Sequence, residues 1–287
     1  MKRVAIALSS VVALAAGFLT GQAGGLALAS EGAPEPEPVE TDEGVEVGPL
    51  VERARAVWEE DYGFWPSYAF HRQVVRRRLD KNGEIGWSTQ YLFEVTPSAM
   101  GFDEELIEID GREPTPEEVL EHRRAGRFEA RYESEASLQN PFGKDLPVLP
   151  LLFDQRHVYV GRRVVRGYPC LKTVFAARNP PSRAPARQRL GYVFQGDACF
   201  SIPGNHLVRA ELETAQGVSA GVAGLQYLRV QIESDPVGGK RWLPSRFEVR
   251  SDVRVGWKQL RIWNLYRYFD FSYRGSGDSD GEDSTEP

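Results

Sequence analysis

The second half of the chain is a succession of short segments in which apolar and charged residues alternate one by one. In 206–213 valine, alanine and leucine alternate with arginine and glutamate, and 226–234 repeats the pattern with leucine, valine and isoleucine. Successive side chains of a strand point to opposite faces of a sheet. The alternation therefore predicts strands with one covered and one wet face, which is typical of antiparallel sheets.

The same patterning predicts strands along most of the chain. They lie at 68–79, 87–95, 106–110, 158–165, 170–177, 188–194, 198–201, 206–213, 226–234, 246–253 and 260–273. Asn82-Gly83, between the first two, favours a tight hairpin turn. No regular alternation of strands and helices occurs, so we predict a mainly β (α+β) fold. It is a single curved antiparallel sheet, or incomplete barrel, wrapped around two or three helices.

Two helices and one packed loop complete the prediction. Apolar residues at helical spacing predict a helix over 49–60. Thr115, Pro116 and Glu118 form a helix start with a capping box, and the polar helix predicted over 115–131 should lie on the surface or act as a lid. Prolines predict irregular chain over 136–150, although the apolar run 146–153 should pack against the core.

The two ends of the chain indicate an exported protein. Lys2 and Arg3, an apolar run and the small residues before Ala29 predict a signal peptide over 1–29. We expect an acidic disordered linker over 30–47, a β domain over 48–274 and an acidic disordered tail over 275–287. The location predicted is the periplasm, with no transmembrane anchor after cleavage.

The charge of the domain argues against nucleic acid as a partner. Residues 31–47 carry seven acids and residues 275–287 carry five, without a base in either segment. The rest of the mature chain has 33 bases and 29 acids, a net of about +4. That excess is small, and no helix has a dense basic stripe.

The only two cysteines are predicted to form a disulfide. Cys170 and Cys199 lie almost symmetrically about a proline-rich stretch, 179–187. If that stretch is the loop of a hairpin, the two residues face each other within a residue or two, and disulfides persist in exported proteins. Two buried free thiols are the alternative.

No pattern of residues indicates catalysis, so we predict no catalytic residue, no metal, no cofactor and no enzyme. His71, His122, His157 and His206 are far apart and have no metal-ligand spacing. The chain also lacks the G-x-S-x-G motif of serine hydrolases.

Aromatic side chains on the predicted strands are the remaining candidates for a site. In a closed sandwich they would be ordinary core, whereas in an open half-barrel they would line a surface that holds an acyl chain. The ligand-lining candidates are Trp87, Tyr91, Phe93, Trp242, Phe247, Trp263, Phe269 and Phe271. The pattern alone leaves both alternatives open.

The order of these elements resembles a known superfamily. RLGYVF (189–194), HLVRAELE (206–213), GKRWLPSRFEVRSDVR (239–254) and YRYFDFSYR (266–274) follow a helix and a strand pair. The sequence resembles bacterial periplasmic proteins of the outer-membrane lipoprotein carrier-like superfamily. The resemblance implies a curved sheet around helices with a hydrophobic cavity, and lipid or lipoprotein binding as the activity. A protein partner in the envelope, bound by a domain with a filled core, is the alternative.

Overall fold

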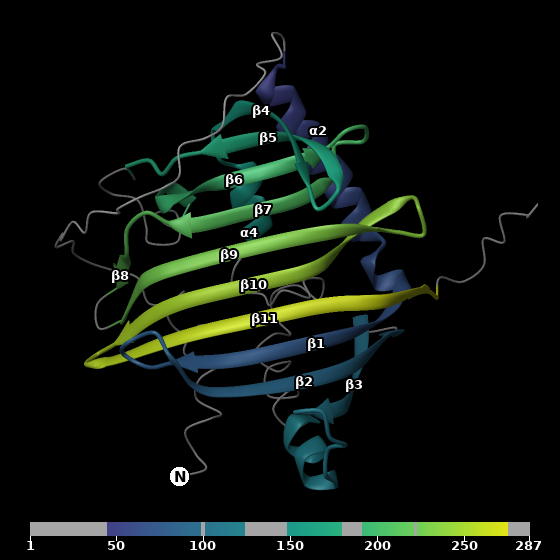
Figure 1. Cartoon of the computed structure of the whole chain (residues 1–287), viewed down its shortest axis with the longest axis vertical. Coiled ribbons are helices and arrows are strands. Elements are labelled where there is room, and N and C mark those ends of the chain that lie inside the picture. The colour runs from purple at the N-terminus through teal and green to yellow at the C-terminus, as the bar shows by residue number, and fades with distance from the viewer. Residues whose placement is uncertain (1–44, 99–100, 124–147, 180–190, 221–222, 275–287) are drawn as a thin grey trace, which may run out of the picture.

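The computed structural model describes residues 45–98, 101–123, 148–179, 191–220 and 223–274, and one antiparallel sheet dominates them (Figure 1). Ten strands follow the order β3-β2-β1-β11-β10-β9-β7-β6-β5-β4, and an eleventh, β8, pairs with β9. The order does not close on itself, so β3 and β4 are the edges of an open sheet. The predicted mainly β fold, not closed into a barrel and accompanied by a few short helices, is confirmed.

The elements have the following bounds. The strands are β1 Tyr68–Leu79, β2 Ile85–Ser98, β3 Gly101–Ile109, β4 His157–Val165, β5 Tyr168–Phe175, β6 Phe194–Ser201, β7 Leu207–Thr214, β8 Val218–Ala220, β9 Ala223–Val237, β10 Arg241–Val255 and β11 Lys258–Tyr273. The helices are α2 Val47–Gly63, the short η1 Trp65–Ser67 and α4 Val148–Phe153, with further helical residues at 116–123 and 191–193.

One face of the sheet, called the helix face below, lies against α2 and α4. Figure 1 shows both helices behind the strands, and α2 contacts β4, β10 and α4. Leu50, Val51 and Ala54 are buried on α2, whereas glutamates and arginines cover its outer side. The main apolar core lies between these helices and the sheet. Its largest fully buried side chains are Trp65, Phe194, Phe200, Leu50, Leu152, Leu207, Leu212, Leu228, Ile232, Leu243, Val74 and Val95.

The opposite face carries rows of charged residues and is called the charged face. Glu248 lies on β10 between Arg246 and Arg250, at 2.6 and 2.9 Å, and is buried beneath their side chains. Burial on its own raises the pKa of Glu248, but the hydrogen bonds from the two arginines outweigh it, so the pKa falls below its usual value. Similar pairs join neighbouring strands, such as Arg229 and Glu211 at 2.7 Å. The alternation seen in the sequence thus produces one apolar and one charged face.

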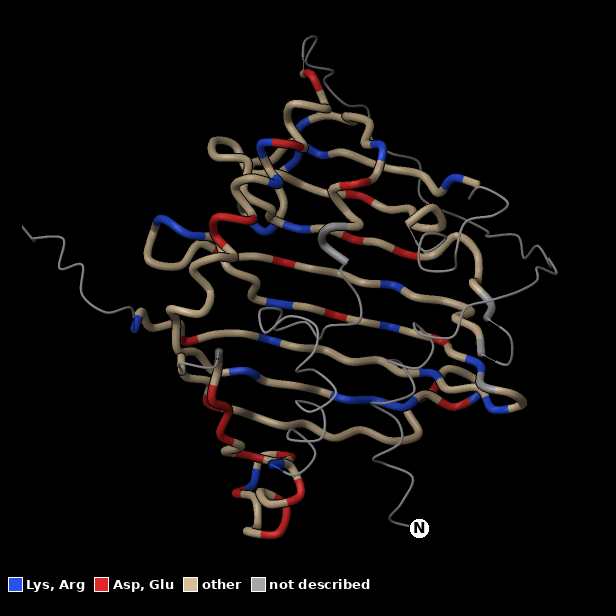
Figure 2. Tube along the Cα trace, turned by 180° about the vertical axis from the view of Figure 1, so that it is seen from behind, with Lys and Arg blue, Asp and Glu red and all other residues tan. Residues whose placement is uncertain are grey.

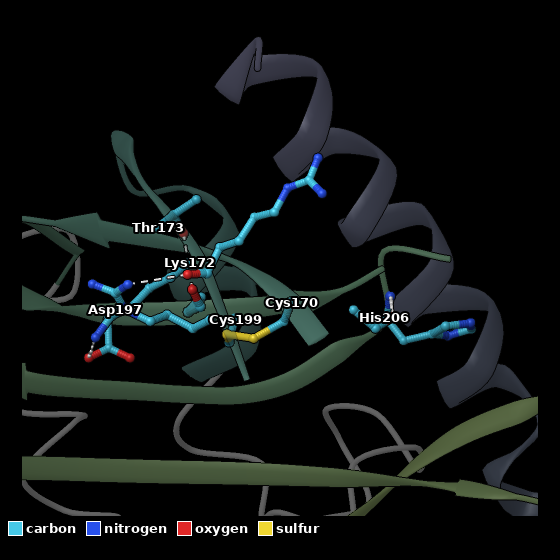
Figure 3. Close-up of a disulfide and its surroundings, with 10 residues drawn as sticks. Cys170, Lys172, Thr173, Asp197, Cys199 and His206 are labelled. Carbon is cyan, nitrogen blue, oxygen red and sulfur yellow. Dashed lines mark hydrogen bonds and ion pairs between the residues drawn. A yellow bond between two sulfur atoms is a disulfide. The ribbon is translucent and has the colours of Figure 1, made fainter. Parts of the chain in front are cut away.

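The predicted disulfide is confirmed and lies on the charged face. Cys170 on β5 and Cys199 on β6 are bonded, with their Cα atoms 5.6 Å apart. The strands are paired directly, and the two cysteines are offset by two positions in the register. Figure 3 shows the bond between the strands, close to the Lys172–Asp197 ion pair. Together with Val208 the cysteines form a small second apolar cluster.

Two predictions of local structure are wrong. Residues 191–193, predicted as part of a strand, are helical, and Val193 and Phe194 are both buried. The apolar run before Phe153 forms α4 and not irregular chain. Pro150 is tolerated there because it lies in the first turn, where a backbone N–H has no partner within the helix.

A bulge in β11 changes the predicted sharing of faces. Asp270 has a φ of 55°, and the register of β1 with β11 shifts at this place. As a result Phe269 packs against His71 on the charged face, while Phe271 packs against Trp65 on the helix face. Strict alternation had placed Phe269 and Phe271 together.

Candidate ligand-binding face

Burial on the helix face changes along the sheet. Three rows of paired residues cross from β2 to β9, and each row ends in a fully buried side chain on β9. In the row that is farthest from α2, Trp87 on β2 is 51% exposed and Leu228 on β9 is 1% exposed. Six half-buried residues between these limits are called the binding face here: Tyr91, Val249, Ser251, Ile262, Asn264 and Tyr266.

The binding face is mainly apolar but contains one buried polar atom without a partner. The side-chain oxygen of Asn264 is buried, and no described residue donates a hydrogen bond to it. A buried acceptor without a donor costs about 1–3 kcal/mol, and such groups in folded proteins call for an explanation. A ligand that donates a hydrogen bond here would remove this cost.

Arginines on β1 lie in the same rows, between the β2 and the β11 members of the binding face. Arg72, Arg76 and Arg78 alternate onto the helix face in register with β11 residues. Arg72 is held by Glu104 at 2.6 Å and lies over the ring of Phe93. The guanidinium of Arg76 lies 5.6 Å from the centre of the Tyr91 ring. Strand β1 therefore offers cationic groups next to the apolar residues of the binding face.

A pocket lies at the end of the sheet beside Trp87. Its volume is about 410 Å³, and it is lined by Arg78, Leu79, Asp80, Lys81, Gly86, Trp87, Gln259 and Arg261. The size falls in the range of small-ligand sites. Three of the eight lining residues are basic and one is acidic, so the pocket can accommodate an anionic group.

The structure divides the eight predicted lining residues between the two faces. Those on the helix face are Trp87, Tyr91, Phe93, Phe247 and Phe271, and those on the charged face are Trp242, Trp263 and Phe269. The two sets cannot line one site, because the sheet lies between them. Whether the first set contacts a ligand stays a prediction.

The three aromatic residues on the charged face each have neighbours there. Trp263 lies between the guanidinium groups of Arg77 and Arg250, at 4.1 and 4.4 Å from the ring centre. Trp242 packs against Tyr168 and His206 beside the disulfide.

Sequence reasoning missed Asn264, Tyr266 and Arg76 as site residues. A signal for Asn264 was present, since it is the polar member of the alternating series Ile262, Asn264 and Tyr266 on an otherwise apolar face. The three consecutive arginines 76–78 appeared only to weaken the predicted strand. In the structure they place cations on both faces of β1.

A buried carboxylate and a histidine join α2 to the sheet near the other end. Asp61 is 2% exposed, and its Oδ2 lies 2.7 Å from Nδ1 of His206, whose ring stacks on Trp242. The hydroxyl of Ser201, in the same turn, donates to the Pro203 carbonyl and accepts from the His206 backbone N–H. The hydroxyl of Ser201 is therefore engaged in the turn and is not positioned as a nucleophile. The Asp61–His206 pair holds α2 against the sheet.

Two further observations limit the chemistry within the described residues. No group of three or more histidine, cysteine, aspartate or glutamate side chains is arranged to hold a metal ion in this part of the chain. None of the helices described has the length and hydropathy that a bilayer crossing requires. The predicted signal peptide and tail lie outside the described residues.

Comparisons with known proteins give only distant matches. No family model matches the chain, and no curated protein matches it. The solved structures similar to it include the following three. A DUF1329 family protein from Desulfovibrio piger has 11% identity and a TM-score of 0.29, with 79% of this chain and 95% of that chain covered. An outer membrane lipoprotein-sorting protein domain from Vibrio parahaemolyticus has 8% identity and a TM-score of 0.31, with 80% and 95% covered.

The third is the MucA/MucB complex of Pseudomonas aeruginosa, with 10% identity, a TM-score of 0.23, and 79% and 100% covered. One of these distant matches is thus a lipoprotein-sorting protein domain, the kind of protein that the sequence resembles.

Proposed function

We propose that this protein binds the acyl chain of a lipid or acylated lipoprotein on the binding face. It would act as a non-enzymatic binding or carrier protein of the cell envelope, located in the periplasm. The observation that carries the proposal is the half-buried apolar region around the unpartnered oxygen of Asn264.

The rows of the binding face suit a molecule with an apolar body and a polar end. An acyl chain would lie against Tyr91, Val249 and Tyr266, and each methylene that it buries contributes about 0.8 kcal/mol. A hydroxyl or amide of the ligand would donate to Asn264. An anionic end would meet Arg76 or Arg78 on β1.

A protein partner is the second candidate, and the edge strand β3 favours it. Residues 103–123 contain nine acids and two bases, and Figure 2 shows the acids gathered on β3 and the helical residues that follow. Charges on an edge strand hinder pairing with further strands. They would also attract a basic partner.

The test is the lipid content of the protein purified gently from its native host. Native mass spectrometry should show bound lipid. Ser251→Trp places a large ring between Leu228 and Ile262 on the helix face and should lower lipid occupancy at least about tenfold, because the added ring fills the volume of several methylenes. Gln231→Trp, on the charged face of β9, is the matched control and should retain the lipid.

Two results would contradict the proposal. One is a wild-type protein that carries no lipid and takes up no fatty acid when it is supplied. The other is equal occupancy in Ser251→Trp and Gln231→Trp.

A further inference from the structure

Two hairpin ends lie side by side at one end of the sheet. One is formed by residues 76–87 of β1 and β2, and the other by residues 250–263 of β10 and β11; together they are called the basic tip. Figure 1 shows both ends at the left of the sheet. Arg78 pairs with Ile262, and Leu79 pairs with Arg261. The guanidinium of Arg261 also donates to the backbone carbonyls of Asp80 and Lys81, which holds the two hairpins together.

Large apolar side chains project from the basic tip. Trp257, at the apex of the β10–β11 hairpin, is 93% exposed, and Trp87 and Ile85 are 51% and 52% exposed. Exposed apolar groups that cluster at one place mark an interaction surface. Tryptophan in particular favours the boundary between water and lipid, because its ring has an apolar body and a polar N–H.

The basic tip has a strong positive charge. It contains eight lysines and arginines and three acids, a net of +5. Two of these acids are already engaged, because Asp252 binds Arg261 and Gln259 while Asp80 accepts from backbone N–H groups of the turn. Among the described residues, no carboxylate pairs with Arg78, Lys81 or Lys258. Their charges are therefore available to a partner.

The pocket of about 410 Å³ opens between these same hairpins. Arg78, Lys81, Trp87 and Arg261 line it. The carboxylate of Asp80 lines it too, and its Oδ1 accepts from the backbone N–H groups of Asn82 and Glu84. Two cations without a carboxylate partner, next to an indole ring, suit a phosphate that is attached to an apolar body.

From these features we infer that the basic tip docks on the surface of a bilayer that contains anionic phospholipid. Trp257 enters the headgroup layer, and a headgroup phosphate occupies the pocket. The combination of an apolar anchor with surrounding lysine and arginine is the one that gives peripheral binding to anionic membranes. The inference rests on the proposed function in one respect: it names the surface from which the acyl ligand would be taken or to which it would be delivered.

The test is co-sedimentation of the delipidated protein with phospholipid vesicles. It should bind vesicles that contain phosphatidylglycerol and not vesicles of phosphatidylcholine alone. Loss of one cation lowers membrane binding by about fivefold, so Lys258→Glu should weaken binding at least about tenfold. Lys240→Glu, at the opposite hairpin between β9 and β10, changes the net charge equally and should weaken binding less than about twofold.

A second measurement detects insertion directly. Phospholipids with brominated acyl chains should quench tryptophan fluorescence, and Trp257→Phe should remove most of that quenching. Because Trp257 and Lys258 are exposed, both variants should keep the thermal stability of the wild type.

Three outcomes would overturn the inference: no binding to anionic vesicles, equal loss in Lys258→Glu and Lys240→Glu, or unchanged quenching in Trp257→Phe. Retention on an immobilised acidic protein without vesicle binding would assign the basic tip to a protein partner instead. Ser251→Trp separates the two proposals, since it should lose acyl occupancy but still bind vesicles.

Discussion

The tryptophans at the two ends of the sheet have opposite environments. Near α2, Trp65 is 1% exposed and packs edge-on against Phe70, Tyr268 and Phe271. At the basic tip, Trp257 is 93% exposed. The difference follows from the elements packed against each end, since α2 supplies partners for Trp65. The same sheet thus carries a packed aromatic core at one end and an exposed tryptophan at the other.

The largest expected effect is the loss of Trp65. Trp65→Ala should lower the free energy of unfolding by about 3–5 kcal/mol, because it leaves a cavity among the rings of Tyr62, Phe70, Tyr268 and Phe271. Trp257→Ala should change it by no more than about 0.5 kcal/mol. Urea unfolding followed by circular dichroism measures both, and similar losses in the two variants would show that the ends do not differ.

Removal of the disulfide should come next in size. Cys170→Ala combined with Cys199→Ala should lower the free energy of unfolding by about 3–4 kcal/mol, because the crosslink closes a loop between residues 29 positions apart. Thermal and urea unfolding of the double variant measure the loss. Vesicle binding should persist below the unfolding transition, because the cysteines lie away from the basic tip. Loss of vesicle binding in a folded double variant would contradict the view that the basic tip acts independently of the disulfide.

A smaller effect distinguishes two aspartate–histidine pairs. Asp61→Asn should cost about 1–3 kcal/mol, because the buried carboxylate contacts both His206 and Arg241. Asp270→Asn is the control: its carboxylate meets His71 at 3.0 Å on an exposed site and should contribute no more than about 1 kcal/mol. Equal losses of unfolding free energy in the two variants would contradict the conclusion that Asp61 holds α2 against the sheet.

The last prediction concerns pH. Nε2 of His157 lies 2.9 Å from the Leu152 carbonyl, to which it must donate, and Nδ1 lies 2.9 Å from the hydroxyl oxygen of Thr173. Burial lowers the pKa of His157 below its usual value of about 6.5. As the pH falls below that value, the unfolded chain takes up a proton before the folded protein does, so stability decreases.

The stability of the wild type should therefore decrease below pH about 6.5 and be unaffected by this group above it. His157→Gln should have a shallower dependence over the same range. Urea unfolding midpoints of both proteins, measured across this pH range, test the prediction. An identical dependence of the midpoint on pH in the two proteins would contradict the contribution of His157.

The fold was largely predictable because each strand carries a local signal. Strand β1 begins and ends at the predicted residues 68 and 79, since the Asn82-Gly83 turn fixes one end. The face of a residue after an irregularity was not predictable: the bulge at Asp270 moved Phe271 to the other face. Helix α4 was missed because its stability comes from packing, and its proline, Pro150, argues against a helix locally.

The candidate site was predictable only in part. Aromatic content identified Trp87 and Tyr91, but alternation alone could not say which of the two faces α2 and α4 cover. Trp242 and Trp263 were therefore grouped with residues on the opposite side of the sheet. The role of Asn264 depends on the absence of a hydrogen-bond partner for its side-chain oxygen among the described residues. Such an absence can be recognised only in the three-dimensional structure.

The most direct test of the central claim is photocrosslinking with a fatty acid that carries a diazirine on its acyl chain. The account predicts crosslinks on the binding face, at residues such as Tyr91, Ile262 and Tyr266. The core beneath α2 and the charged face should remain unlabelled. Labelling of Trp263 or Phe269 on the charged face, or no labelling of the folded protein, would contradict it.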